Sequence, residues 1–144
     1  MNELADLMRT KVLRLEQAMR GMQQAELTTL HYFADGMYCR YLFRPAGCLI
    51  VGKVHKREHF YIIAKGKVQV VGDDSVDIYA AGTVLISQPG TKRAVLALED
   101  SVCVTVHRTA KRNLDKIERE LVEDDKCALF DARNELRHKR LKVG

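Results

Sequence analysis

The chain has 144 residues and a mass of 16.4 kDa, which is the size of one ordinary domain. Hydrophobic residues make up 47% and charged residues 30% of it, with no tryptophan and 2 prolines, a composition that excludes disordered and collagen-like chains. No apolar stretch approaches the roughly 18 residues that a membrane span needs. The first ten residues lack the apolar core of a signal peptide, so we expect a cytoplasmic protein.

The net charge of +5 is unevenly distributed along the chain. Residues 1–35 carry a net charge of −1, residues 36–72 of +6, residues 73–100 of −3 and residues 101–144 of +3. The question of an anionic partner therefore concerns the central segment. Nucleic acid is not the expected partner, because no recognised reader motif is present and no aromatic residues interleave the basic tail.

The cysteines favour a reducing compartment. None of them forms a C-x-x-C pair and three lie in strand-like stretches, so we expect reduced and mostly buried thiols rather than disulfides or a zinc site. They are Cys39, Cys48, Cys103 and Cys127.

The first quarter of the chain is predicted to be an amphipathic helix over residues 2–25. Its apolar residues recur at steps of three and four, which places them on one stripe that needs a cover, either from the same domain or from a second subunit. The stripe consists of Leu4, Met8, Val12, Leu15, Met19 and Met22.

From residue 27 the pattern changes to nine short runs rich in Val, Ile, Tyr and Thr, separated by Gly, Pro or Asp. Alternation with a period of two and the absence of intervening helices predict an antiparallel sandwich or barrel. The runs are Leu30–Phe33, Met37–Phe43, Cys48–Val54, His59–Ile63, Lys67–Val71, Val76–Tyr79, Thr83–Ile86, Ala94–Leu98 and Val102–His107.

Beyond Thr109 the helical period returns, which completes a single domain made of a helix (1–26), a β-barrel (27–109) and a helical tail (110–144). Asn113 is the expected cap of a first tail helix, and Asp124 or Asp125 of a second. The first carries Leu114, Ile117 and Leu121, and the second carries Leu129, Ala132 and Leu136.

The stretch from Gly47 to His107 resembles the cupins, the double-stranded β-helix family with motifs G-x5-H-x-H-x3-E-x6-G and G-x5-P-x-G-x2-H-x3-N. The first motif falls on Gly47, Lys53, His55, His59 and Gly66, and the second on Gly82, Gln88, Gly90, Arg93 and Ala97. The sequence of residues 37–109 also resembles small cupin-like proteins of tailed bacteriophages. This resemblance implies a phage origin, and with it a location in the host cytoplasm, but it implies no particular activity.

In metal-bearing cupins, the two histidines and the glutamate of the first motif and the histidine of the second hold one cation. Here Lys53 and Arg93 occupy two of those four positions, and neither side chain can bind a metal at neutral pH. The resemblance therefore implies at most a reduced divalent-metal site at His55 and His59, completed by Glu58 or His107.

The same substitutions favour an anion. Lys53, His55, His59 and Arg93 would make the barrel pocket a cluster of donors suited to a nucleotide, sugar phosphate or carboxylate. Three further residues join the expected ligand-binding set: Arg57 and Lys92 at the mouth, and His107. Arg57 as a solvated loop charge and His107 as a structural residue remain alternatives.

Three functional hypotheses follow. The first is an anion-binding cupin that is non-enzymatic or weakly enzymatic, which in a phage would sequester or sense a host nucleotide signal. The second is a metal-dependent isomerase, epimerase or dioxygenase with Glu58 or Tyr61 as acid–base candidates. The third is an assembly protein that acts through its amphipathic helices. The resemblance implies a homodimer or higher homo-oligomer in each case.

Overall fold

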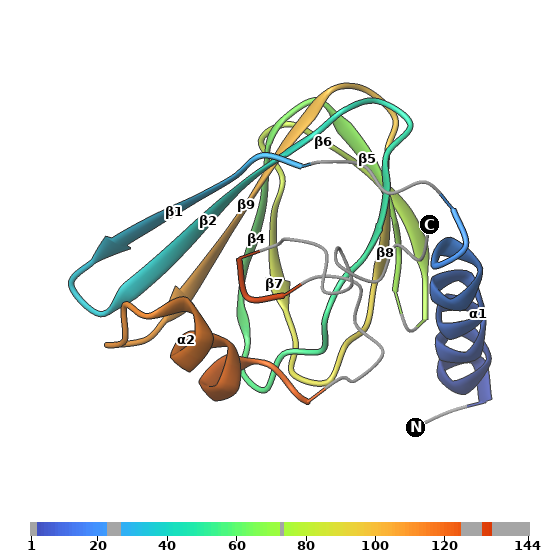
Figure 1. Cartoon of the computed structure of the whole chain (residues 1–144). Coiled ribbons are helices and arrows are strands. Elements are labelled where there is room, and N and C mark those ends of the chain that lie inside the picture. Colours follow the sequence, from blue (N-terminus) through green and yellow to red (C-terminus); the bar gives the residue numbers. More distant parts are fainter. Residues whose placement is uncertain (1–2, 23–26, 73, 125–130, 134–144) are drawn as a thin grey trace, which may run out of the picture.

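The computed structural model describes residues 3–22, 27–72, 74–124 and 131–133. Within these residues, two helices flank nine strands, as Figure 1 shows. The elements are α1 (Glu3–Met19), β1 (Thr29–Ala34), β2 (Met37–Arg44), β3 (Leu49–Val51), β4 (His59–Lys65), β5 (Lys67–Val71), β6 (Val76–Ala80), β7 (Val84–Ser87), β8 (Ala94–Ala97), β9 (Ser101–Arg108) and α2 (Leu114–Leu121).

The strands form two antiparallel sheets that enclose the core. One sheet has the order β1-β2-β9-β4-β7 and the other β3-β8-β5-β6. Buried side chains from both sheets meet between them, among them Leu42, Ile63, Val68 and Val95. The mainly β barrel between helices was the predicted fold class, and each of the nine predicted runs overlaps a strand.

The four motif glycines occupy turns with positive φ, a conformation that other L-residues rarely adopt. Gly66 also has no room for a side chain. A Cβ there would lie 2.4 Å from the Ser101 hydroxyl oxygen and 2.5 Å from the Asp100 carbonyl oxygen. The motif spacing therefore correctly located a turn that requires glycine.

Helix α1 packs on its own domain. Val12 and Met19 are buried in a cluster with Val51 and Ala94, on the outside of the four-stranded sheet, and Figure 1 shows α1 beside β8. The helix ends at Met19, before the predicted residue 25, and a turn follows it. Because the helix ends there, the predicted stripe is shortened and Met22 is exposed.

Helix α2 covers one end of the barrel. The side chain of Asn113 caps it by accepting a hydrogen bond from Lys116 N at 3.1 Å, as predicted. Ile117 and Leu121 pack against Tyr38 of β2. The second predicted tail helix lies largely outside the described residues, of which 131–133 form a turn.

The outer face of the five-stranded sheet is apolar. The strand register places ten uncharged side chains in two rows that each cross all five strands. Phe60 is 48% and Ile86 56% exposed. The rows are Tyr32, Cys39, Val106, Phe60 and Ile86, and Leu30, Tyr41, Val104, Ile62 and Val84.

The described cysteines are free thiols. Cys103 is buried in the core, whereas Cys39 and Cys48 are half-buried, and Cys127 lies outside the described residues. No helix among the described residues has the length and apolar character needed to cross a membrane.

Candidate functional site

A cavity of about 100 Å³ lies inside the barrel, between the two sheets. Four cationic side chains line it: Arg40 and Arg44 from β2, Lys53 after β3, and Arg93 before β8. Strand β2 supplies two of them because its side chains alternate, which turns Tyr38, Arg40, Leu42 and Arg44 inward. The cavity is therefore strongly basic.

The arginines of β2 expose unpaired donors to this cavity. Among the described residues, the buried side-chain nitrogen and oxygen atoms without a hydrogen-bond partner are Arg40 Nε, Arg44 Nε, Arg44 Nη1 and Tyr61 Oη. All of them belong to residues that line the cavity. Buried polar groups are almost always hydrogen-bonded, so such a concentration of orphaned donors marks a place prepared for an acceptor.

Two carboxylates lie near these arginines: Glu16 lines the cavity, and Glu118 acts favourably on Arg40. Burial lowers the pKa of Arg40 below its ordinary value, with Arg44 adding repulsion. Arg93 stacks over the Tyr61 ring, with its guanidinium carbon 5.9 Å from the ring centroid. Lys53 differs, because its ammonium group pairs with Glu118 of α2.

Three histidines meet beside the cavity. The ligand-capable atoms of His55, His59 and His107 lie within 4.8 Å of one another. The ring centroids of His55 and His107 are each less than 4.5 Å from that of His59, at 4.3 and 4.4 Å. His55 and His59 line the main cavity, which joins this histidine triad to the arginines.

The triad is neutral at physiological pH. Burial and the neighbouring His59 lower the pKa of His55 to about 3, and the same two causes, with His55 added, lower that of His107 to about 2. Burial also lowers the pKa of His59. Neutral imidazoles are the form that binds metal ions.

Each ring of the triad makes a hydrogen bond to a neighbouring group. His59 Nδ1 lies 3.4 Å from the Arg57 carbonyl oxygen, His107 Nε2 lies 2.9 Å from the Thr105 hydroxyl, and His55 bonds the backbone of Lys53. Such partners orient metal-binding histidines in proteins. Three imidazole nitrogens are a ligand set that suits zinc, cobalt or nickel.

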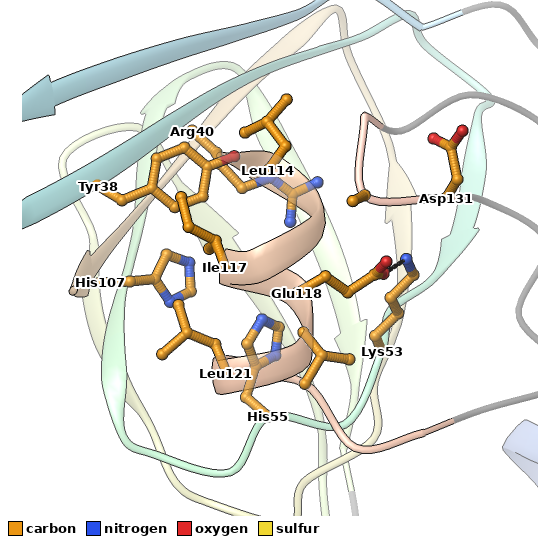
Figure 2. Close-up of a pocket in the computed structure, with 12 residues that line it drawn as sticks. Tyr38, Arg40, Lys53, His55, His107, Leu114, Ile117, Glu118, Leu121 and Asp131 are labelled. Carbon is orange, nitrogen blue, oxygen red and sulfur yellow. Dashed lines mark hydrogen bonds and ion pairs between the residues drawn. The ribbon is translucent and has the colours of Figure 1, made fainter. Parts of the chain in front are cut away.

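A second, smaller pocket lies under α2. Figure 2 shows its lining: Ile117 and Leu121 of the helix near His55 and His107, and the Lys53–Glu118 ion pair at one side. The backbone hydrogen bond from Lys56 N to Leu121 O, 2.7 Å long, fixes the end of the helix to this wall. Helix α2 thus shields the triad from that side.

Three predicted site residues lie elsewhere. The exposed Arg57 pairs with Glu120 at 3.2 Å instead of lining the cavity mouth, since the chain turns outward after His55. The exposed Glu58 is not part of the triad. Lys92 is buried against α1, where it pairs with Glu16 at 3.2 Å, because the side chain next to the inward Arg93 points the opposite way.

The remaining predicted residues do come together. Lys53, His55, His59, Tyr61 and Arg93 line one cavity, and His107 completes the triad. Tyr61 is buried, and burial raises the pKa of its phenol above the ordinary value, so it can donate a hydrogen bond at neutral pH.

Sequence reasoning missed Arg40 and Arg44, which it counted only in the charge of residues 36–72. Their positions, two, four and six residues along the strand for Arg40, Leu42 and Arg44 counted from Tyr38, could have predicted that both arginines share a face of the strand with these large residues.

Comparison with known proteins supports this architecture. The sequence matches no protein-family model and no curated protein sequence. Among solved structures, a cupin superfamily protein from Desulfitobacterium hafniense is 11% identical, with 61% of this chain and 82% of that chain covered and a TM-score of 0.52. A Cupin 2 conserved barrel domain protein from Salinispora arenicola is 18% identical, covering 63% and 84% at a TM-score of 0.51.

A third similar structure is KdgF from Halomonas sp., at 14% identity, 63% and 86% coverage and a TM-score of 0.53. Likeness at these identities concerns the fold, and the two facing antiparallel sheets agree with it. The chain therefore has the cupin fold.

Proposed function

We propose that this protein is a binding module that holds a small anionic molecule, through a carboxylate or phosphate group, inside its barrel. The observation that carries the proposal is the set of buried, unpaired donors on Arg40 and Arg44. An anion supplies the acceptors that these donors lack, and charge-assisted hydrogen bonds from guanidinium groups are among the strongest in proteins.

The charges around the cavity support an anion over a neutral ligand. An uncompensated buried charge is costly, and three arginines face one small space. Glu16, which lines the cavity, pairs with Lys92, and Glu118, which also acts on Arg40, pairs with Lys53, so the cavity keeps an excess of positive charge. A bound carboxylate or phosphate would lower the cost of burying these cations, which a neutral ligand would not do.

The size of the cavity favours the smaller molecules among the expected ligands. About 100 Å³ accommodates an acid group with a few attached atoms, given that one water needs roughly 10–15 Å³ by the same measure. A nucleotide would place its phosphate here and its base outside. The resemblance to phage proteins makes a host nucleotide signal a further candidate.

Isothermal titration calorimetry of the full chain against sulfate, phosphate, acetate and nucleoside monophosphates tests the proposal. We expect at least one anion to bind, and Arg44→Met to weaken it at least tenfold. Arg57→Met is the matched control, because Arg57 is half exposed and lies outside the cavity. No binding by any anion, or equal binding by both variants, would falsify the proposal.

A metal-dependent enzyme is the second candidate, and the histidine triad is the observation that favours it. His55, His59 and His107 would hold the ion, which would supply a Lewis acid or an activated water in a barrel that also binds the acid group of a substrate. Elemental analysis of the purified protein tests this candidate. Metal content that does not change in the His55→Ala/His59→Ala variant rules it out.

We also propose that a second copy of this chain covers the apolar rows on the outer face of the five-stranded sheet. The ten side chains are uncharged, and a two-fold axis through this face would pair apolar rows with apolar rows without burying a charge. An exposed face of this composition is typical of an interaction surface.

A further inference from the structure

We propose that the metal site and the anion site of this barrel are thermodynamically coupled, so that a divalent cation binds tightly only together with an anion. The inference rests on the proposed function and adds a regulatory rule to it. The histidine triad takes the cation, the arginines take the anion, and each ligand raises the affinity of the other.

The first step is the charge of the triad. Its three ligands are imidazoles, which bind metal ions in the neutral form, and no Asp or Glu joins them among the described residues. A divalent ion bound there therefore keeps its full charge. Metal sites that contain a carboxylate neutralise part of that charge, whereas this one has no such means.

The second step is the set of cations around the triad. Arg40 lines the pocket under α2 together with His55 and His107, and Arg40 and Arg93 line the barrel cavity together with His55 and His59. Cations held beside the triad repel a divalent ion, and the repulsion grows with the charge of that ion. The triad alone is thus a poor metal site, despite three suitable ligands.

The third step is the shared cavity. His55 and His59 line the same space as Arg40, Arg44 and Arg93. A metal ion held by the three histidines would accept a further oxygen ligand. An anion held by the arginines would share this space with the ion, where it would neutralise the arginines and attract the metal.

Coupling of this kind is reciprocal. If the anion strengthens metal binding by some factor, the metal strengthens anion binding by the same factor. This coupling distinguishes the barrel from a metal site whose affinity does not depend on anions and from an anion site whose affinity does not depend on metals. It would let the protein respond to the joint presence of two small ligands.

The test is calorimetry of Co²⁺ binding to the metal-free full chain, in a weakly coordinating salt of constant ionic strength, with and without sulfate or acetate. The visible d–d spectrum of Co²⁺ reports its coordination independently. We expect either anion to lower the Kd for Co²⁺ at least tenfold, and Co²⁺ to lower the Kd for that anion by the same factor.

Two variants test the anion site and the metal site separately. Arg44→Met removes donors for the anion without touching the triad, so we expect it to leave Co²⁺ binding in the absence of anion intact and to weaken the coupling. His59→Gln should lose Co²⁺ and retain the anion. An anion that binds the metal-free chain while the Kd for Co²⁺ stays unchanged overturns the coupling alone. Failure of sulfate, phosphate, acetate and nucleoside monophosphates to bind, with or without Co²⁺, overturns the proposed function as well.

Discussion

Replacing Arg44 with methionine should stabilise the ligand-free protein. Arg44 is 5% exposed, and its Nε and Nη1 atoms have no hydrogen-bond partner. Each such donor costs about 1–3 kcal/mol relative to a hydrated one. Methionine retains most of the apolar contact of the arginine stem and removes both donors and the charge.

The expected net gain is about 2 kcal/mol, which is within the range found when buried ionic groups are replaced by apolar ones. For a domain of this length, that gain raises Tm by about 6 °C. The comparison is a thermal melt of both proteins in a buffer without sulfate, phosphate or carboxylate. The exposed Arg57→Met serves as control and should shift stability by less than about 0.5 kcal/mol.

A bound anion should reverse the order of stability. At a concentration one hundred times its Kd, the anion stabilises the native protein by about 2.7 kcal/mol. The Arg44→Met variant binds the anion weakly and gains little, so the native protein should then melt at the higher temperature. A variant that melts lower than the native protein without any anion would refute the reasoning, because the guanidinium would then have acceptors that we have not identified.

Three further predictions concern other parts of the chain. The free energy of unfolding of the metal-free protein should fall between pH 7 and pH 5, because His107, with a folded-state pKa of about 2, takes up a proton in this range only in the unfolded chain. His107→Gln should reduce this fall by about 2 kcal/mol, measured by urea titration at both pH values. Gly66→Ala should destabilise the fold by more than about 3 kcal/mol and Gly47→Ala by about 1 kcal/mol, since both have positive φ but only Gly66 lacks room for a Cβ. Phe60→Asp should convert a dimer into a monomer in sedimentation analysis, and a native chain that is monomeric at every concentration would contradict the proposed sheet interface.

Local patterns were sufficient to predict the strands and turns. Lys67–Val71 was predicted with the bounds that β5 has, because alternation and flanking glycines are properties of neighbouring residues. The end of α1 was less predictable. The stripe continues to Met22, but the helix ends at Met19, where the last buried contact with the sheet is made. Packing against a distant strand decided that boundary.

The site was only partly predictable, because spacing along the chain does not give the direction of a side chain. The cupin-like spacing correctly grouped His55, His59 and Arg93. It misplaced Lys92, whose partner Glu16 comes from a helix more than 70 residues away in the sequence. His107 joins the triad through the pairing of β9 with β4, and no pattern within β9 reports that pairing.

Strand β2 shows why a common rule failed and how the two proposals are related. The usual assignment would direct Arg40 and Arg44 to solvent and Tyr41 and Phe43 to the core. The register does the opposite: the arginines face the cavity, and Tyr41 joins an apolar row outside. Water alone is a poor partner for both faces of this sheet, because the inner face carries buried cations and the outer face is apolar. Both proposals therefore start from this register: a bound anion would supply an acceptor within the barrel, and a second copy of the chain would cover the apolar outer surface.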